Sequence, residues 1–279
     1  MIIRCWGARG SIPVSGKQYL QYGGNTTCLE IRTKNDDILI VDCGSGIREL
    51  GNLLLSENRH TYTILLTHAH WDHIMGFPFF KPIYSHKTSI TVWGCPFAQV
   101  SLKEMLSRIM APPNFPVKFD AITAHISYQD TCTDSYRLGS MTITPIALSH
   151  PNQGSGYKFE EDGKCFVFLT DNELGFRHEG GLDYVDYLNF SRGADLLIHD
   201  AEYTEEEYKK TRGWGHSVYQ DALKLALEAG VKKLGLFHHN QERFDEAVEA
   251  IVDKCHQEII RCDTDLECFA VRQGTELAL

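Results

Sequence analysis

An apolar run that ends in four ligand-type side chains is the feature that most constrains the fold of this chain. The stretch TILLTHAHWDHIMG, residues 63–76, begins like a buried strand and then places imidazoles and carboxylates at four positions: His68, His70, Asp72 and His73. Such groups are costly to bury together unless something satisfies them. The pattern therefore predicts a metal site at the end of a core strand.

Comparable side chains follow three other predicted strands. His150 follows ITPIALS, Asp171 follows CFVFLT, and the adjacent pair His238 and His239 follows LGLF. Strand ends that meet at one edge of a sheet are where α/β proteins build their sites. The combined set exceeds the four ligands of one tetrahedral zinc ion and fits two metals that share a bridging carboxylate and a bridging water. Zinc, manganese and iron all accept such ligands.

Composition narrows the class of protein. The 279 residues are 43% hydrophobic and 23% charged, with no apolar run approaching the roughly 18 residues of a membrane span. The first ten residues, MIIRCWGARG, lack the regions of a signal peptide, so we expect a cytoplasmic protein. The net charge of −10 gives no electrostatic footprint for a long nucleic acid. Nine cysteines without a C-x-x-C pair favour buried, reduced thiols over a disulfide framework.

Periodicity and turn signals divide the chain into short strands and amphipathic helices. Strands are expected over 1–7, 26–33, 37–44, 61–68, 89–94, 124–129, 141–150, 164–171, 194–201 and 232–239, and helices over 46–57, 98–110, 183–193, 217–230 and 243–260. Strand-rich segments mixed with α/β units predict two sheets packed face to face with helices outside. We expect a single domain over residues 1–279.

The motif HAHWDH, with His150, Asp171 and His238 downstream, resembles the metallo-β-lactamase-fold hydrolases along the whole chain. The resemblance implies an αββα sandwich with two divalent metal ions. The implied ligands are His68, His70 and His150 for one metal and Asp72, His73 and His238 for the other, with Asp171 between them. Asp42, in LIVDCGSG, would support the metal loop from outside the ligand set; a turn-starting Asp is the alternative.

Only one of the adjacent residues His238 and His239 can face the metals, because neighbouring side chains of a strand point to opposite faces. The strand pattern of LGLF favours His238, and His239 stays open as the alternative.

The C-terminal third, with ADLLIHDAEY and WGHSVYQDALKLALEAGVKKLGLFHH, resembles the phosphodiesterase branch that includes ribonuclease Z. The resemblance points to His216, backed by Asp200, as a proton donor to the leaving group. It also implies that Asp72 is a catalytic residue and that His199 supports the site from outside the ligand set. Two metals can activate water, yet a basic leaving group still needs a proton. The alternative for His199 and Asp200 is an ordinary pair of loop residues. The alternative for His216 is a residue at the N-terminus of a helix.

The substrate is expected to be a small phosphodiester, such as a cyclic nucleotide or another cyclic phosphate. The intervals 151–170 and 172–198 are too short for a basic, Gly/Pro-rich insertion that could grip a transfer RNA. Phe115 is a candidate for an aromatic wall, and Gly154 and Gly156 are candidates for a substrate-contacting loop; core packing and a hairpin turn are the alternatives. Arg9 could contact phosphate.

Two other functions remain open. The same metals could hydrolyse a carbonyl substrate such as a lactam, lactone or thioester, or the chain could be a metal-bearing sensor or accessory protein without turnover. The sequence also leaves the metal and the oligomeric state open, with a homodimer as one arrangement.

Overall fold

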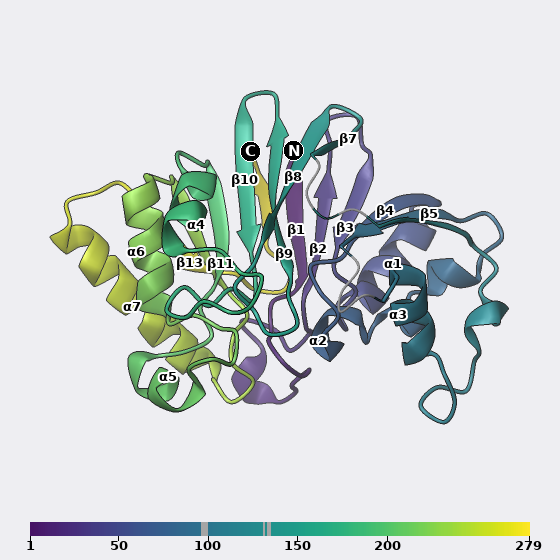
Figure 1. Ribbon diagram of the computed structural model, residues 1–279, viewed down its shortest axis with the longest axis horizontal. Coiled ribbons are helices and arrows are strands. Elements are labelled where there is room, and N and C mark those ends of the chain that lie inside the picture. Colours follow the sequence, from purple (N-terminus) through teal and green to yellow (C-terminus); the bar gives the residue numbers. More distant parts are fainter. Residues whose placement is uncertain (96–99, 131, 133–134) are drawn as a thin grey trace.

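Two mixed β-sheets of seven strands each form the centre of the molecule (Figure 1). This computed structural model describes residues 1–95, 100–130, 132 and 135–279. The first sheet has the order β14-β1-β2-β3-β4-β5-β6, with β1 Ile2–Gly7, β2 Cys28–Arg32, β3 Ile38–Val41, β4 Thr61–Leu65, β5 Ser89–Gly94, β6 His125–Asp130 and β14 Glu276–Ala278. The second has the order β13-β12-β11-β10-β9-β8-β7, with β7 Tyr136–Leu138, β8 Met141–Ala147, β9 Ser155–Glu161, β10 Lys164–Leu169, β11 Leu196–Asp200, β12 Lys233–Phe237 and β13 Glu267–Ala270.

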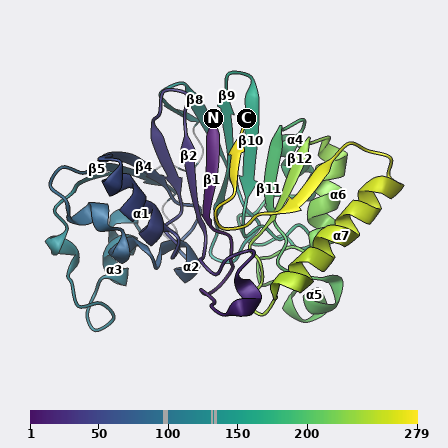
Figure 2. The ribbon, with the colours of Figure 1, turned by 180° about the vertical axis from the view of Figure 1, so that it is seen from behind.

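Helices cover the outer face of each sheet, as Figures 1 and 2 show from opposite sides. The first sheet carries α1 Ile47–Ser56 and α3 Leu102–Ile109, and the second carries α4 Tyr184–Ser191, α6 Tyr219–Ala229 and α7 Asp245–Arg261. The short helices α2 Trp71–Ile74 and α5 Glu205–Thr211 lie toward the end of the sheets opposite the two termini. Short 3-10 turns occupy Lys17–Tyr19, Phe77–Phe79, Lys81–Tyr84 and Phe119–Ala121.

Three apolar layers hold this arrangement together. Ile31, Phe159 and Phe168 are among the buried residues between the two sheets. Leu50 of α1 packs in a second layer beneath the first sheet's helices, and Leu223 of α6 packs in a third beneath the helices of the second sheet. The expected αββα sandwich is therefore confirmed.

Local sequence explains two of the helix boundaries. Ser101 accepts a hydrogen bond from the Glu104 amide and so caps the start of α3. Residues 98 and 99, where this helix was expected to begin, lie outside the described residues. Later in the chain, α6 stops at Gly230, whose φ of 63° suits a residue without a side chain.

Several short elements had no pattern strong enough to predict them. These are the strands β7, β13 and β14 and the helices α2 and α5. The pairing of β14 with β1, Ile2 opposite Ala278, joins the two ends of the chain. Three-residue strands carry almost no periodicity, so only the partner strand reveals them.

The cysteine expectation needs a correction. Cys95 and Cys132 form a disulfide between the end of β5 and the segment before β7. A separation of 37 residues gives no local signal for this pairing. The remaining cysteines are free, and five of these seven are buried as expected: Cys5, Cys28, Cys43, Cys255 and Cys268.

In the described part of the chain, no helix has both the length and the apolar character needed to cross a membrane.

Candidate metal centre

Three of the expected site residues share an unusual backbone conformation just beyond a core strand. Asp42 follows β3, Asp171 lies two residues beyond β10, and His238 follows β12, with φ values of 63°, 52° and 58°. Non-glycine residues seldom adopt this left-handed region, which costs roughly 1–2 kcal/mol per residue. Backbone strain of this kind clusters at functional sites. His238 is thus placed by a left-handed turn and not by simple strand alternation.

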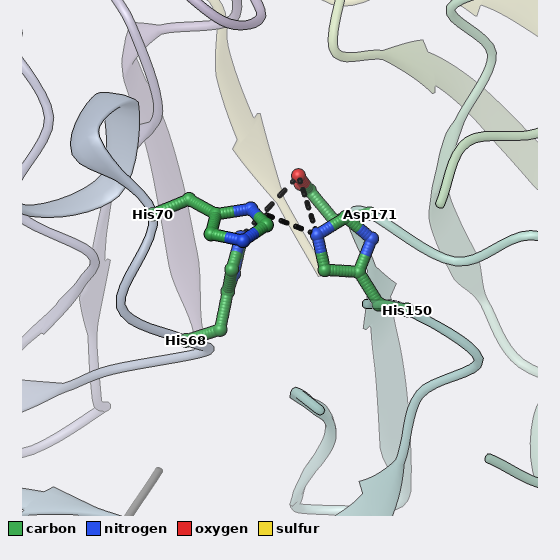
Figure 3. A group of neighbouring side chains, drawn as sticks. All are labelled: His68, His70, His150 and Asp171. Carbon is green, nitrogen blue, oxygen red and sulfur yellow. Dashed lines mark hydrogen bonds and ion pairs between the residues drawn. The ribbon is translucent and has the colours of Figure 1, made fainter. Parts of the chain in front are cut away.

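The expected ligands converge from both sheets into two groups that share Asp171. In each group the candidate ligand atoms lie within 4.8 Å of one another. The first group is His68, His70, His150 and Asp171, and the second is Asp72, His73, Asp171 and His238. Figure 3 shows the first group, with His68 and His70 facing His150 and Asp171.

Asp171 lies between the two groups. Its Oδ1 is 3.2 Å from Nε2 of His73, and its Oδ2 is 3.5 Å from Nε2 of His68 and 3.4 Å from Nε2 of His238. Oδ2 thus lies near ligands of both groups, and Oδ1 faces the second group. This is the position that a bridging ligand would need.

Two buried nitrogen atoms test whether a cation fits here. The Nε2 atoms of His68 and His73 are buried and have no hydrogen-bond partner among the described residues. An unsatisfied buried polar atom is costly, by about 1–3 kcal/mol. Both atoms point into the cluster beside Asp171, so a divalent ion would satisfy them. The donor set of imidazole nitrogen and carboxylate oxygen suits zinc, manganese or iron.

The electrostatics of the cluster also favour a cation. Burial lowers the pKa of His73, but the carboxylates of Asp171 and Asp72 outweigh it and hold that pKa well above its ordinary value. Burial raises the pKa of Asp171, and the charges of His238 and His73 outweigh it in the opposite direction. Carboxylates likewise hold the pKa of His238 well above its ordinary value, so without bound metal they favour protons on His73 and His238, which metal binding would release.

Hydrogen bonds from outside the ligand set orient the ring of His73. Asp42 Oδ2 lies 2.7 Å from His73 Nδ1, and Asp42 also accepts hydrogen bonds from the Thr67 amide at 2.8 Å and the Thr67 hydroxyl at 2.7 Å. Asp42 is fully buried. Its contact with Nδ1 leaves His73 Nε2 for the cluster, so Asp42 holds the metal loop as well as one ring.

His238 and His150 are oriented in the same way. Glu202 Oε2 lies 2.9 Å from His238 Nδ1, and the Gly215 carbonyl lies 2.9 Å from His150 Nδ1. A third contact fixes a carboxylate, since the Ser11 amide donates to Asp72 Oδ2 at 2.8 Å. These contacts aim the remaining ligand atom of each side chain at the cluster.

Two glycines allow the backbone to approach ligand rings closely. A side chain at Gly10 would place its Cβ 2.4 Å from the His238 ring, and one at Gly215 would place it 2.1 Å from His150 Nδ1. Gly215 also has a φ of 99°, which other residues rarely adopt.

His216 and Asp200 form a buried pair beside the cluster. His216 Nδ1 lies 2.6 Å from Asp200 Oδ2, and the His216 ring stacks on His238 with centroids 4.5 Å apart. Burial lowers the pKa of His216, but Glu202 and Asp200 outweigh it and raise that pKa to about 9. The atoms of Asp171, Asp200, His216 and His238 also lie close enough to form a third group of ligand type. The short Asp200 contact gives His216 a partner already.

His199 lies behind this pair. It is fully buried, its Nδ1 donates to the Asp200 carbonyl at 2.7 Å, and its Nε2 lies 3.3 Å from the Asn172 amide. It therefore braces the end of β11, which carries Asp200.

Comparison with known families gives the decisive match. Residues 38–239, most of the chain, match the family described as Beta-lactamase superfamily domain. The chain belongs to this superfamily. The matched range includes HAHWDH and extends to His239, so it contains every candidate ligand described above.

Curated relatives and solved structures agree with this assignment. Ribonuclease Z of Sulfurisphaera tokodaii is 25% identical over 270 residues, covering 80% of this chain and 84% of the relative. Ribonuclease Z of Haloarcula marismortui is 22% identical and covers 94% of both chains. The metallo-β-lactamase fold protein YhfI of Bacillus subtilis has a TM-score of 0.73 at 17% identity, over 99% of this chain and 98% of that one. A diphosphatase from the PhnP family has a TM-score of 0.69 at 15% identity, over 100% and 97%.

These relatives leave one sequence expectation without support. The net charge argued against a long nucleic acid as partner, yet curated relatives of this superfamily member carry the name ribonuclease. Net charge is a whole-molecule quantity and does not describe the local field at a metal site.

The two adjacent histidines point in different directions. The side chain of His238 points into the cluster, and that of His239 points away from it. His238 Nε2 lies 3.1 Å from Asp72 Oδ2. His239 is also buried, but its Nε2 donates to the Val271 carbonyl at 2.7 Å and its ring packs against Tyr22.

Arg9 has a structural place. Its buried guanidinium donates to the carbonyls of Gly23, Asn240 and Arg243 and so ties three segments together. These contacts do not support the expectation that Arg9 binds phosphate.

The three candidates for substrate contact lie in different surroundings. Phe115 packs edge-on against Phe79, with ring centroids 5.5 Å apart. Gly156 is buried in β9, where a Cβ would lie 2.5 Å from Leu169, so close packing explains this glycine. Gly154 lies near the cluster, since a Cβ there would come 3.5 Å from the Cβ of His68.

Sequence reasoning missed two buried carboxylates that serve the site. Glu202 orients His238 and lies 3.4 Å from His216 Nδ1. Glu173 accepts hydrogen bonds from the amides of Gly213 and Gly215, both at 2.7 Å. Each follows an expected site residue by two positions, in DNE and DAE, and this repeated spacing was the available signal.

Proposed function

We propose that this enzyme is a dinuclear metal-dependent phosphodiesterase that hydrolyses a small phosphodiester, such as a cyclic nucleotide or another cyclic phosphate. One observation carries the proposal: a buried histidine–carboxylate pair, His216 with Asp200, stands beside two ligand groups joined by Asp171. An acid next to a two-metal site matches the needs of phosphodiester cleavage, because the leaving alkoxide is a strong base.

The residues that would hold the metals are the seven named above. His68, His70 and His150 would bind one ion, Asp72, His73 and His238 the other, and Asp171 both. When bound, two divalent ions neutralise phosphoryl charge and make water acidic enough to serve as the nucleophile near neutral pH. We propose zinc, with manganese and iron as the other metals that suit this donor set.

The chain's own residues would manage the proton. Asp200 accepts from His216 Nδ1 and fixes the ring, which leaves Nε2 as the nitrogen that donates to the departing oxygen. In the metal-free protein, the carboxylates of Glu202 and Asp200 raise the pKa of His216 to about 9 against the effect of burial, so their charges favour a proton on this ring. We propose that His216 carries the proton that the leaving group needs.

The local fold supports a small substrate. Residues between His150 and Asp171 fold into the compact hairpin of β9 and β10, and those between Asp171 and β11 fold into a loop and α4. Neither interval carries an additional arm for a large partner.

A ribonuclease activity is the second candidate, and the names of the curated relatives favour it. In that case the same ligands and the same acid would act on an RNA phosphodiester. A carbonyl hydrolase is the third, because two-metal sites also polarise carbonyl groups.

One panel of substrates separates these candidates. Metal-replete protein is assayed with bis-p-nitrophenyl phosphate, a 2′,3′-cyclic nucleotide, a 3′-extended transfer RNA transcript, a lactone, a thioester and a lactam. We expect turnover of the two small phosphodiesters, abolished by a chelator and restored by zinc, manganese or iron. Hydrolysis of the carbonyl compounds alone would refute the phosphodiesterase proposal. Cleavage of the transcript alone would refute a small substrate and favour ribonuclease activity. Nucleotide binding without turnover would favour the sensor alternative.

A further inference from the structure

A pocket of about 310 Å³ opens directly beside the first ligand group. Its walls include the candidate ligands His68 and His70. Ligand sites usually span about 300–1,000 Å³, so this pocket has room for one compact group. A substrate whose phosphate sits at the metals would place a neighbouring substituent here.

The far wall of the pocket is apolar. Ile74 of α2 and Met105 and Ile109 of α3 contribute to it, together with Val100. Ile74 and Met105 are themselves buried in the core beneath the first sheet's helices, which fixes their positions. A rigid apolar wall suits the face of a flat ring.

The rim of the pocket is polar. Arg108 contributes a guanidinium from the last turn of α3, and Asn152 contributes an amide group that lies 3.4 Å from His70 Nε2. Arg108 is exposed and reaches back to Glu104 on its own helix at 2.6 Å, so it can be redirected by a ligand. A guanidinium can stack on an aromatic ring, and it can donate hydrogen bonds to carbonyl oxygens carried by a heterocyclic ring.

The backbone of this rim is held in a costly shape. Asn152 and Gln153 are consecutive non-glycine residues with φ values of 64° and 68°. Two residues other than glycine in succession seldom adopt this left-handed region. The Gln153 amide donates to the His150 carbonyl at 3.1 Å and so ties the rim to the first ligand group. Backbone outliers of this kind persist only where the surrounding structure imposes them, and they are typical of functional sites.

We infer that this pocket binds the nucleobase of a nucleoside phosphodiester while the phosphate lies at the metals; the inference rests on the proposed function. A base offers two apolar faces to Met105 and Ile109 and polar edge atoms to Arg108 and Asn152. An alkyl substituent would use only the apolar wall and leave the polar rim unmatched. The structure thus favours nucleoside esters over simple alkyl phosphodiesters.

Three p-nitrophenyl esters that share one leaving group test this inference. They are the p-nitrophenyl ester of thymidine 5′-phosphate, methyl p-nitrophenyl phosphate and hexyl p-nitrophenyl phosphate. We expect kcat/KM for the nucleoside ester to exceed that for the methyl ester by tenfold or more. We further expect Arg108→Ala and Ile109→Ala each to lower this ratio severalfold. Lys103→Ala, an exposed change on the same helix and away from the pocket, leaves the ratio as in the wild type.

The outcomes separate the pocket from the function. Hydrolysis of all three esters at similar kcat/KM, or ratios that the two pocket variants do not change, would overturn the base pocket while the phosphodiesterase proposal stands. If kcat/KM for the hexyl ester exceeds that for the methyl ester by as much as the nucleoside ester does, the base pocket is overturned in favour of a purely apolar site. No hydrolysis of any ester by metal-replete protein would instead contradict the proposed function. Circular dichroism and metal content of each variant confirm that the comparison is made on folded, loaded protein.

Discussion

His216 Nδ1 lies 2.6 Å from Asp200 Oδ2, while its ring stacks on His238 at a centroid distance of 4.5 Å. The first contact fixes the orientation of the His216 ring, and the second places it over a candidate metal ligand. A histidine so held can deliver a proton at the cluster without binding a metal itself.

His216→Ala should therefore keep the metals and slow the reaction in proportion to the basicity of the leaving group. A p-nitrophenolate departs without a proton, whereas a ribose or alkyl alkoxide needs one. We expect turnover of a cyclic nucleotide to fall by roughly 10²–10⁴, the usual range for general acid catalysis, and turnover of a p-nitrophenyl ester to fall much less. Both rates and the metal content are measured, with the exposed His86→Ala as control. Equal losses on both substrates would remove the acid assignment.

Asp171→Ala should lower the occupancy of both metal sites at once. Its two oxygens lie 3.2 Å from His73 and 3.5 Å from His68, which belong to different ligand groups. A residue that serves only one ion would leave the other in place. We expect well below two equivalents of metal per chain, measured by elemental analysis after dialysis, with the exposed Asp253→Ala retaining both. Two full equivalents in the Asp171 variant would contradict the bridging role.

The adjacent histidines should behave in opposite ways. His238 contacts Asp72 and Glu202 within the cluster, whereas His239 donates to the Val271 carbonyl away from it. We expect His238→Ala to lose metal and activity and His239→Ala to retain metal while losing some stability. Metal content and activity of the two variants, measured side by side, check this. The reverse pattern would show that the metal faces His239.

His239 should also make the metal-free protein sensitive to acid. Burial, helped by the nearby charge of Arg9, lowers the pKa of His239 to about 3, and the unfolded chain has a pKa of about 6.5. Between these values the unfolded state binds the extra proton, so stability present above about pH 6.5 is lost as the pH falls toward 3. The contribution is up to about 1.4 kcal/mol per pH unit.

Urea unfolding in the presence of a chelator measures this contribution. Other titrating groups cancel when wild type and His239→Gln are compared at each pH from 7 to 4. We expect the difference in free energy of unfolding to shift in favour of the variant as the pH falls. The exposed His125→Gln gives the reference slope. A difference that stays constant with pH would mean that His239 does not resist protonation in the folded state.

The sequence alone predicts the ligands because each one ends a strand with a clear apolar pattern. HAHWDH, His150 and Asp171 all follow runs such as ILL or FVFL, and parallel strand ends must meet at one edge. The layers follow from the same patterns, since alternation of strands and amphipathic helices leaves few ways to bury both sheets.

Asp42 could be assigned a supporting role from the resemblance, but the contacts of Glu202 and Glu173 could not be predicted from strand patterns. Glu202 meets His238 across 36 residues and Glu173 meets Gly215 across 42, in loops without periodicity. The Cys95–Cys132 bridge is likewise a product of two loops that only the folded sheet brings together. Such partners depend on loop geometry, which single-sequence patterns do not encode.

Glu173 illustrates how a residue outside the cluster can control it. Its buried carboxylate accepts hydrogen bonds from the Gly213 and Gly215 amides and from the Tyr208 hydroxyl, and it contacts His178 at 2.7 Å. Gly215 in turn accepts from His150 Nδ1 through its carbonyl. Glu173 thus fixes the segment that both orients His150 and leads into His216.

Glu173→Gln should weaken the site without touching a ligand. The Gly213 amide donates to Glu173 Oε1 and the Gly215 amide to Oε2, so the single oxygen of glutamine can serve only one of them. Its NH₂ group then faces the other donor and leaves buried polar atoms unmatched. We expect a loss of about 1–3 kcal/mol in the free energy of unfolding of the metal-free protein. We also expect metal affinity or activity to fall by roughly 10–100-fold, as for other residues that orient ligands.

The two readouts distinguish positioning from general destabilisation. Glu179→Gln, an exposed change on the same loop, serves as the matched control for both. Metal affinity is measured by competition with a chromophoric chelator at a temperature where both variants are fully folded. A weaker affinity in Glu173→Gln alone supports the path from Glu173 through Gly215 to His150. Unchanged affinity and activity in a merely less stable Glu173 variant would limit this carboxylate to holding the loop together.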